Sequence, residues 1–173
     1  MGDPRKLKRK FETPKKIWES ERIADEQHLL EEFGLKSMHE LWVMKTELRK
    51  VRREARRLLS LGDRGKEEGS VLLAKVRRLG MAKEGTTLED LLSLDIKDVL
   101  NRRLETLVVK KGLARTYSQS RQLITHGFIS ISGKRVSAPS YLVPVSEEGK
   151  ISYYKPIRLE QPTPVMEGKK SSE

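Results

Sequence analysis

The sequence contains no cysteine and few aromatic residues, and both shortages narrow what the chain can do. Without cysteine there is no disulfide, no thiolate metal ligand and no cysteine nucleophile, and three scattered histidines leave little for an imidazole metal site. We therefore expect no metal and no cofactor. Aromatic residues make up only 5% of the chain, too few for the stacking platform with which some proteins hold single-stranded nucleic acid.

Long apolar runs and catalytic motifs are also missing. No apolar stretch approaches the roughly 20 residues that span a bilayer, and the N-terminus has basic residues without an apolar signal core. We expect a cytoplasmic protein with no membrane partner. There is no G-x-x-x-x-G-K phosphate loop, no paired histidine and no nucleophile with an identifiable base, so we expect neither an enzyme nor a small-molecule substrate.

Positive charge is what the sequence has in excess. Lys and Arg number 36 against 25 Asp and Glu, a net charge of +11. This excess predicts a polyanionic partner, with nucleic acid as the obvious candidate. An apolar fraction of 36% over 173 residues supports two small cores rather than one large core.

Charge occurs in blocks that divide the chain into four predicted segments. Residues 1–20 hold seven Lys or Arg against three acids, with two prolines, and form a basic extension. Residues 21–100 form a helical domain, residues 101–160 a small basic module, and residues 161–173 a flexible tail. The predicted fold class is α+β, in which a mainly helical N-terminal part precedes two or three helices packed on a short, mostly antiparallel sheet.

The helical domain contains one predicted helix with an unusual charge pattern. It begins after Ser37 and ends before Gly62, and its apolar positions occupy about one third of the helical wheel. The adjoining arc carries Lys45, Arg49, Lys50, Arg52, Arg53, Arg56 and Arg57, with Glu47 and Glu54 on the far flank of the apolar stripe. Like charges on one arc repel, which favours contact with RNA or DNA phosphates over an ordinary solvated face.

The basic module is predicted to expose part of a short helix. The helix is capped by Thr116 or Ser118 and runs through Thr125. It is too short to be stable alone, so one arc must dock on the module, and the opposite arc stays free. That free arc holds Ser118, Arg121, Gln122 and Thr125, which suit phosphate and ribose oxygens. A charge reversal at Arg121 should therefore leave the fold intact. Gly127 ends the helix, and an alternating strand with a tight turn at Gly133 and Lys134 follows.

Residues 102–143 carry a set of motifs in a recognisable order. These are Arg102-Arg103-Leu104, a Gly-Leu-Ala-Arg link at 112–115, a Ser-Arg-Gln-Leu-Ile helix at 120–124, His126-Gly127, a Gly-Lys-Arg-Val turn at 133–136 and Pro-Ser-Tyr at 139–141. They resemble the RNA-binding module named after small-subunit ribosomal protein four. Residues 11–61, with their Thr-Pro-Lys-Lys and Phe-Gly-Leu motifs, resemble the N-terminal half of the archaeal and eukaryotic form of that family.

The resemblance covers residues 1–160 and implies a structural constituent of the small ribosomal subunit. It implies direct binding of ribosomal RNA at a multi-helix junction of the 5′ domain, nucleation of subunit assembly, and a contribution to translational accuracy with ribosomal protein five near the messenger RNA entry path. The bacterial form often has a zinc-type cysteine cluster, which is absent here. The alternative is a stand-alone RNA-binding chaperone that uses the same module.

The resemblance also assigns RNA contacts to particular residues. Within the matched motifs these are Arg102, Arg103, Arg115, Arg121, Gln122, His126, Lys134 and Arg135. We add Ser118 and Thr125 from the free arc, the seven cations of the long helix, and Lys8, Arg9 and Lys10 from the basic extension. RNA recognition should depend on phosphate, ribose and shape rather than on base stacking.

Some of these residues have an alternative interpretation. Arg102 and Arg103 could pair with acids of the helical domain, such as Glu89 or Asp98. Lys134 could be only a turn residue with positive φ and a solvated ammonium group.

Three ring side chains are interpreted as structural. His126 is expected to support the helix end rather than act as a base or ligand, because no acid or second histidine stands near it in sequence. Trp18 and Trp42 could stack on bases, but packing is the favoured interpretation for both.

Overall fold

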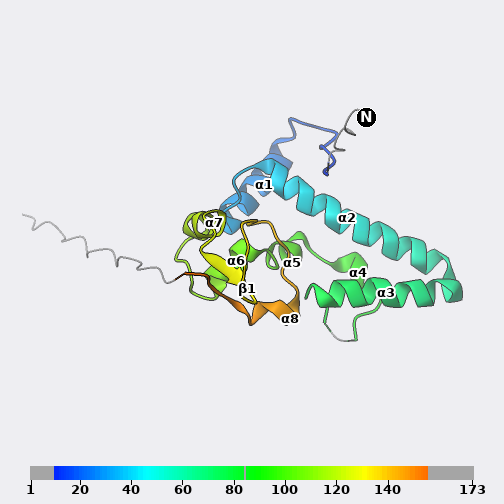
Figure 1. The fold of residues 1–173 in the computed structure, drawn as a ribbon. Helices are drawn as coiled ribbons and strands as arrows, with labels where there is room; N and C mark the ends of the chain where they lie inside the picture. Colours follow the sequence, from blue (N-terminus) through cyan, green and yellow to red (C-terminus); the bar gives the residue numbers. More distant parts are fainter. Residues whose placement is uncertain (1–9, 84, 156–173) are drawn as a thin grey trace, which may run out of the picture.

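The computed structural model of the chain describes residues 10–83 and 85–155 and shows a helical part followed by a small mixed module (Figure 1). The helical part comprises α1 (Ser20–Phe33), α2 (Met38–Ser60), the 3-10 turn η1 (Gly62–Arg64), α3 (Gly65–Arg78), α4 (Asp90–Ser93) and α5 (Ile96–Leu100). The module comprises α6 (Leu104–Lys110), α7 (Tyr117–Thr125), β1 (Ile129–Ile131), β2 (Lys134–Arg135), α8 (Val145–Glu148) and β3 (Ile151–Tyr153). The predicted α+β fold class is confirmed.

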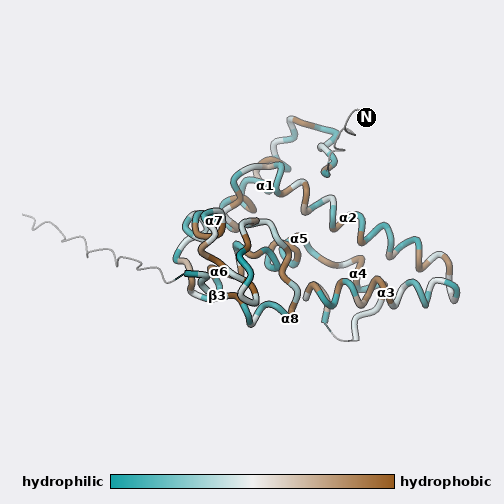
Figure 2. The backbone as a smooth tube through the Cα atoms, in the orientation of Figure 1, coloured by the Kyte–Doolittle hydropathy of each residue, from teal (hydrophilic) through white to brown (hydrophobic). Residues whose placement is uncertain are grey.

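The long helix α2 packs against α3, and the two run as an extended hairpin with α4 beside them (Figure 1). Its apolar stripe is buried as the periodicity predicted, and brown and teal alternate along it in Figure 2. Leu41, Leu48 and Ala55 of α2 are at most 6% exposed and share a core with Leu91 and Leu100. The apolar stripe thus fixes which face of α2 is left for its charged residues.

The module places α6 and α7 on a three-stranded antiparallel sheet with strand order β2-β1-β3. Ile131 pairs with Lys134 across the β1–β2 hairpin, so its two-residue turn is Ser132-Gly133. Both turn residues have positive φ, 51° and 77°, as a type I′ turn requires. The predicted turn at Gly133 and Lys134 is therefore one residue too far along, because Lys134 already belongs to the return strand.

Two buried clusters divide the described chain. The first runs from Phe33 to Leu100, and the second from Leu104 to Ile151. They meet where residues 141–143 cross the chain between α5 and α6: the Leu104 N–H donates to the Tyr141 carbonyl at 2.8 Å. Every helix within residues 10–83 and 85–155 is too short or too polar to span a lipid bilayer. Lys8, Arg9 and the predicted tail over 161–173 lie outside the described residues.

Replacing Leu104 by Asp should unfold the module. Leu104 is 0% exposed in the second core, so a carboxylate there would be buried without a partner and should cost at least about 4 kcal/mol. Urea unfolding followed by circular dichroism measures the loss. Val71→Asp is the matched control, because Val71 is 70% exposed on α3. Equal stability of both variants would contradict the assigned core.

Candidate nucleic-acid interface

A cluster of two arginines and two glutamates joins the helical part to the module. Arg121 of α7 donates from Nη1 and Nη2 to the two carboxylate oxygens of Glu40 on α2, both at 2.8 Å. Arg103, next to α6, donates from Nη2 to the same carboxylate at 2.7 Å. On its other edge Arg121 binds Glu105 of α6 from Nε at 3.1 Å and from Nη2 at 3.0 Å. The bidentate geometry fixes the orientation of α7 against the start of α2.

The positive and negative charges of this cluster balance one another, and the balance requires all four side chains. Burial tends to raise the pKa of Glu40, but the hydrogen bonds from Arg121 and Arg103 outweigh it, and the pKa is lowered overall. Burial raises the pKa of Glu105, which is 1% exposed, and the two arginines offset this only in part. The hydrogen bonds to Glu40 raise the pKa of Arg121. Two carboxylates facing two guanidinium groups carry no net charge.

The predicted free position of Arg121 is wrong, whereas Arg103 pairs with an acid of the helical domain as its alternative interpretation allowed, although that acid is Glu40 and not Glu89 or Asp98. The Arg121 side chain is 20% exposed and that of Arg103 1%, because the start of α2 covers the side of α7 that the helical wheel left empty. Arg102 also pairs, but with neither of the suggested acids: it donates to the Glu148 carboxylate at 2.8 Å and the Val143 carbonyl at 3.0 Å. These three arginines act inside the fold.

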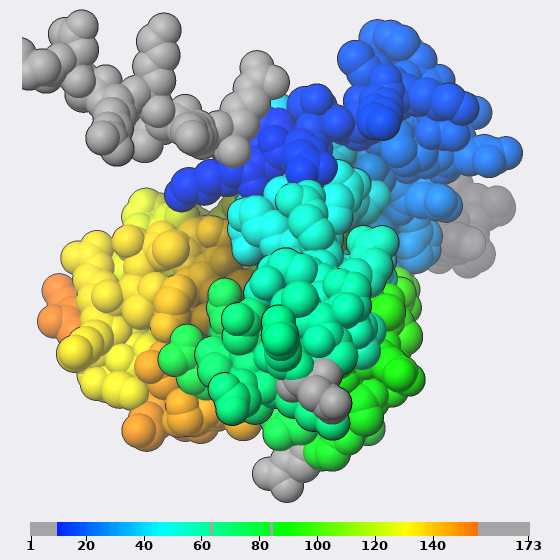
Figure 3. Space-filling view, turned by 90° about the vertical axis from the view of Figure 1, so that its right-hand side faces the viewer, coloured from blue at the N-terminus to red at the C-terminus, as the bar shows by residue number. Residues whose placement is uncertain are grey.

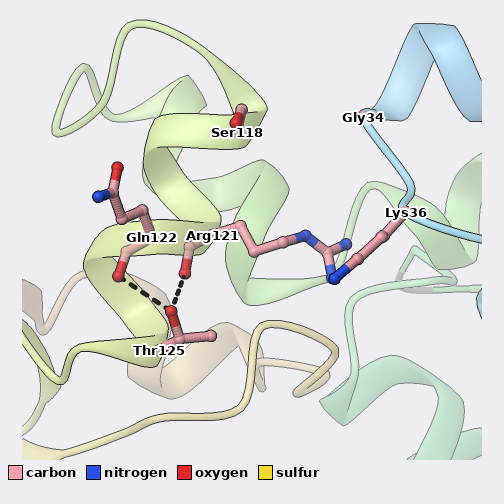
Figure 4. Close-up of a pocket in the computed structure, with 6 residues that line it drawn as sticks. All are labelled: Gly34, Lys36, Ser118, Arg121, Gln122 and Thr125. Carbon is pink, nitrogen blue, oxygen red and sulfur yellow. Dashed lines mark hydrogen bonds between the residues drawn. The ribbon is translucent and has the colours of Figure 1, made fainter.

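A polar groove remains open beside the cluster (Figure 4). It measures about 560 Å³, and its lining consists of Gly34, Lys36, Ser118, Arg121, Gln122 and Thr125. Figure 4 shows Arg121 reaching toward the segment that carries Lys36, while Gln122 points to the other side of α7. The Thr125 hydroxyl donates to the carbonyls of Arg121 and Gln122, which leaves its oxygen as an acceptor.

The end of α7 holds another predicted contact in place. Gly127 has φ of +75°, and a Cβ there would lie 1.8 Å from Nε of Arg135, so only glycine lets this guanidinium lie over the turn. Nη2 of Arg135 donates to the His126 carbonyl at 3.2 Å. His126 occupies the C-cap position of α7, and its exposed ring lies 6.5 Å from that of Phe128.

Two of the cations predicted as RNA contacts lie free on the surface of the module. Arg115 and Lys134 are exposed, and their side chains contact no acid within residues 10–83 and 85–155. The Arg115 backbone is fixed because its N–H donates to Oε1 of Gln119 at 2.8 Å. Arg115 and Lys134 are therefore positioned cations available to an outside anion.

The cations of α2 are less free than their common arc suggested. Lys50 pairs with Glu47 and Arg57 with Glu54. These two acids therefore neutralise one edge of the basic stripe, which is the arc of α2 that carries its seven predicted cations. The other partners of these cations lie outside α2. Arg49 and Arg53 bind the Glu12 carboxylate, and Lys45 binds that of Glu26. Arg57 also binds Glu68, and Arg52 donates to the Leu94 carbonyl. Exposed ion pairs contribute little stability and are readily exchanged. An outside anion could therefore replace the acids that pair with the exposed cations of α2.

A second groove of about 440 Å³ lies between the basic stripe of α2 and the start of α5. Its lining comprises Lys45, Leu48, Arg49, Arg52, Arg56, Asp95 and Ile96. Among the residues that the structure describes, Arg56 donates only to the Arg52 carbonyl, so much of its guanidinium is available. Within residues 10–83 and 85–155, no group of three or more histidine and acidic side chains is arranged to hold a metal ion.

Comparison with known proteins gives the class and then the family of this chain. Residues 102–148 match the family described as S4 domain. The small ribosomal subunit protein uS4 of Methanococcus aeolicus is 48% identical over 155 residues, covering 88% of each chain. That of Saccharolobus solfataricus is 45% identical over 176 residues, covering 100% of this chain and 97% of its own. The chain belongs to the uS4 family of small ribosomal subunit proteins.

Arg121→Glu should destabilise the protein, contrary to what the free arc implied. It would set three carboxylates against Arg103 alone, and breaking a buried ion pair typically costs about 3–5 kcal/mol. Thermal and urea unfolding measure this loss. Gln122→Glu, an exposed neighbour on the same helix, should leave stability nearly unchanged. Equal unfolding midpoints for the two variants would show that the cluster does not hold the interface.

Acid should weaken the contact of Glu26 with its partners on α1 and α2. Glu26 is 2% exposed; burial tends to raise its pKa, but hydrogen bonds from Lys45, Trp42 and Arg22 lower it overall. A lowered pKa gives stability that is present above the unfolded value, near 4.5, and lost as pH falls through the folded value. In Glu26→Gln, the unfolding free energy should fall less steeply below pH 4.5 than in the natural chain. Parallel pH curves from urea unfolding would count against this.

Proposed function

We propose that this protein is a structural constituent of the small ribosomal subunit and binds ribosomal RNA directly. The observation that carries the proposal is the partly buried cluster of Glu40, Arg103, Glu105 and Arg121, which fixes two basic surfaces relative to each other. One surface consists of the exposed cations of α2, and the other consists of the exposed polar and basic side chains of the module. Relatives with 45% and 48% identity bear the name of a small-subunit protein, which supports the same conclusion.

The RNA contacts come from side chains that remain exposed. On the module we assign Arg115, Ser118, Gln122, Thr125, His126, Lys134 and Arg135. On α2 we assign Arg49, Lys50, Arg53, Arg56 and Arg57 directly, with Lys45 and Arg52 lining the second groove. Lys10 is exposed at the start of the described chain, and Lys8 and Arg9 extend the same basic segment. Cations and hydroxyl groups of this kind bind phosphate and ribose and respond to RNA shape.

A fixed pair of basic surfaces suits an RNA site where several helices meet. A protein that binds the folded junction more tightly than the open one stabilises it by the difference in binding free energy. We therefore place the site at a multi-helix junction of the 5′ domain and propose that binding there nucleates assembly. A contribution to translational accuracy with ribosomal protein five near the messenger RNA path completes the proposal and depends on the family resemblance alone.

Reversing two module cations tests this function. Arg115→Glu combined with Lys134→Glu should weaken binding to a 5′-domain transcript at least tenfold and reduce the slope of log affinity against log salt by about two. The matched control reverses Lys75 and Lys83, which are exposed outside the proposed contacts and change the net charge equally. Filter binding across a salt series gives both quantities. Equal losses in the two double variants would mean that only total charge matters.

Comparing binding to the 5′-domain transcript with binding to an unrelated structured RNA of equal length distinguishes the ribosomal role from that of a stand-alone RNA chaperone. A preference of the natural chain for the 5′-domain transcript that persists as salt rises supports the role in subunit assembly. Equal affinities that fall together with salt would contradict it and favour a stand-alone RNA chaperone.

A further inference from the structure

The segment of residues 10–18 has no regular structure, yet it is fastened to α2. The Phe11 ring lies 5.0 Å from the His39 ring and 6.0 Å from that of Trp42, measured between centroids. The Glu12 N–H donates to Oγ1 of Thr46 at 3.1 Å. In Figure 3 this dark blue segment lies across the cyan start of α2. Its first half is therefore held by both apolar and polar contacts.

The far end of the segment is fixed by a chain of hydrogen bonds. Arg22 donates from Nη2 to the Ile17 carbonyl at 2.9 Å and from Nη1 to Oε2 of Glu26 at 2.5 Å. Glu26 in turn accepts from the Trp42 indole at 3.1 Å and from Lys45 at 2.7 Å. The peptide that leads into Trp18 is thus tied to both α1 and α2.

At this fixed position the segment presents an uncovered indole. The Trp18 side chain is 90% exposed and Ile17 is 63% exposed, whereas Trp42 is half-buried with its indole N–H bonded. The packing interpretation is correct for Trp42 and wrong for Trp18. Indole is among the most apolar side chains, and leaving its faces in water forgoes the burial that normally stabilises it. An uncovered indole on an anchored stretch of backbone suits a flat partner.

The charges around Trp18 indicate what that partner is. Lys10, Lys15 and Lys16 are exposed, and Glu12 is the only acid from residue 10 to residue 18. Because Glu12 already binds Arg49 and Arg53, the lysines give the segment a positive surface.

We propose that Trp18 stacks on an unpaired base of the small-subunit RNA while Lys15 and Lys16 bind the adjoining phosphates. The exposed acids Glu19 and Glu21 follow Trp18 on the chain, so the RNA backbone approaches from the lysine side. An indole face accepts any base, and the site therefore adds affinity rather than sequence preference. This inference depends on the proposed RNA-binding function and adds a stacking contact to its phosphate contacts.

Substitutions of Trp18 separate stacking from simple burial. In filter binding of the full chain to complete small-subunit ribosomal RNA, Trp18→Ala should weaken binding about tenfold, with an unchanged salt slope. Trp18→Leu should lose about as much, and Trp18→Phe should retain most of the affinity. The RNA should also quench tryptophan fluorescence of the natural chain more than that of Trp18→Phe, in which Trp42 is the only tryptophan left.

Two results would overturn the stacking site: natural affinity in Trp18→Ala, and equal quenching with and without Trp18. In the first case, failure of Trp18→Ala to join small subunits reconstituted with the other proteins would assign the indole to a protein partner. The natural chain serves as the reference: if it shows no preference for the 5′-domain transcript, the proposed function fails, whereas a preference that Trp18→Ala fully keeps removes only the stacking site.

Discussion

One carboxylate, that of Glu40, holds the two halves of this protein together. It receives hydrogen bonds from Arg103 and Arg121, which lie 63 and 81 residues further along the chain. A close backbone approach accompanies it: a Cβ on Gly34, whose φ is +61°, would lie 2.2 Å from Cβ of Tyr117. Desolvating charged groups is costly, and an apolar contact could stabilise the interface as well, but two arginines on one carboxylate permit few orientations. We attribute the fixed angle between α2 and α7 to this requirement.

Because that angle is fixed, the basic surfaces of α2 and of the module are held at one separation. Independent basic surfaces would bind any RNA by releasing counterions, whereas two surfaces held at one separation bind best where phosphates have the matching arrangement. The outer cations of α2 are held by exposed glutamates, so they are positioned before the proposed binding of RNA. Because such pairs are weak, replacing an acid by a phosphate sacrifices little. The acids thus position the cations without competing strongly for them.

The local features of the fold could be predicted from the sequence, because each depends on neighbours within a few residues. The α+β class, the apolar stripe of α2 and the glycine ends of α1 and α7 at Gly34 and Gly127 are of this kind. The pairing of Arg121 with Glu40 could not be predicted, since a helical wheel shows which arc leaves its own module but not which distant element covers it. Ser37 and Glu40 stand at the spacing of a capping box, yet the Ser37 side chain makes no cap hydrogen bond and the Glu40 carboxylate binds the distant arginines instead.

Composition likewise overstates how much of the module's charge faces RNA. Between Arg102 and Arg135 there are eight basic residues. Arg102, Arg103 and Arg121 pair inside the fold, and Lys110 and Lys111 donate to Asn101 and to the Glu148 carbonyl. The salt dependence of binding counts phosphates neutralised by accessible cations, so it follows the exposed residues and not the sequence total. In the proposed RNA complex the internal arginines act indirectly, because they hold the exposed cations of α2 and the module at a constant distance.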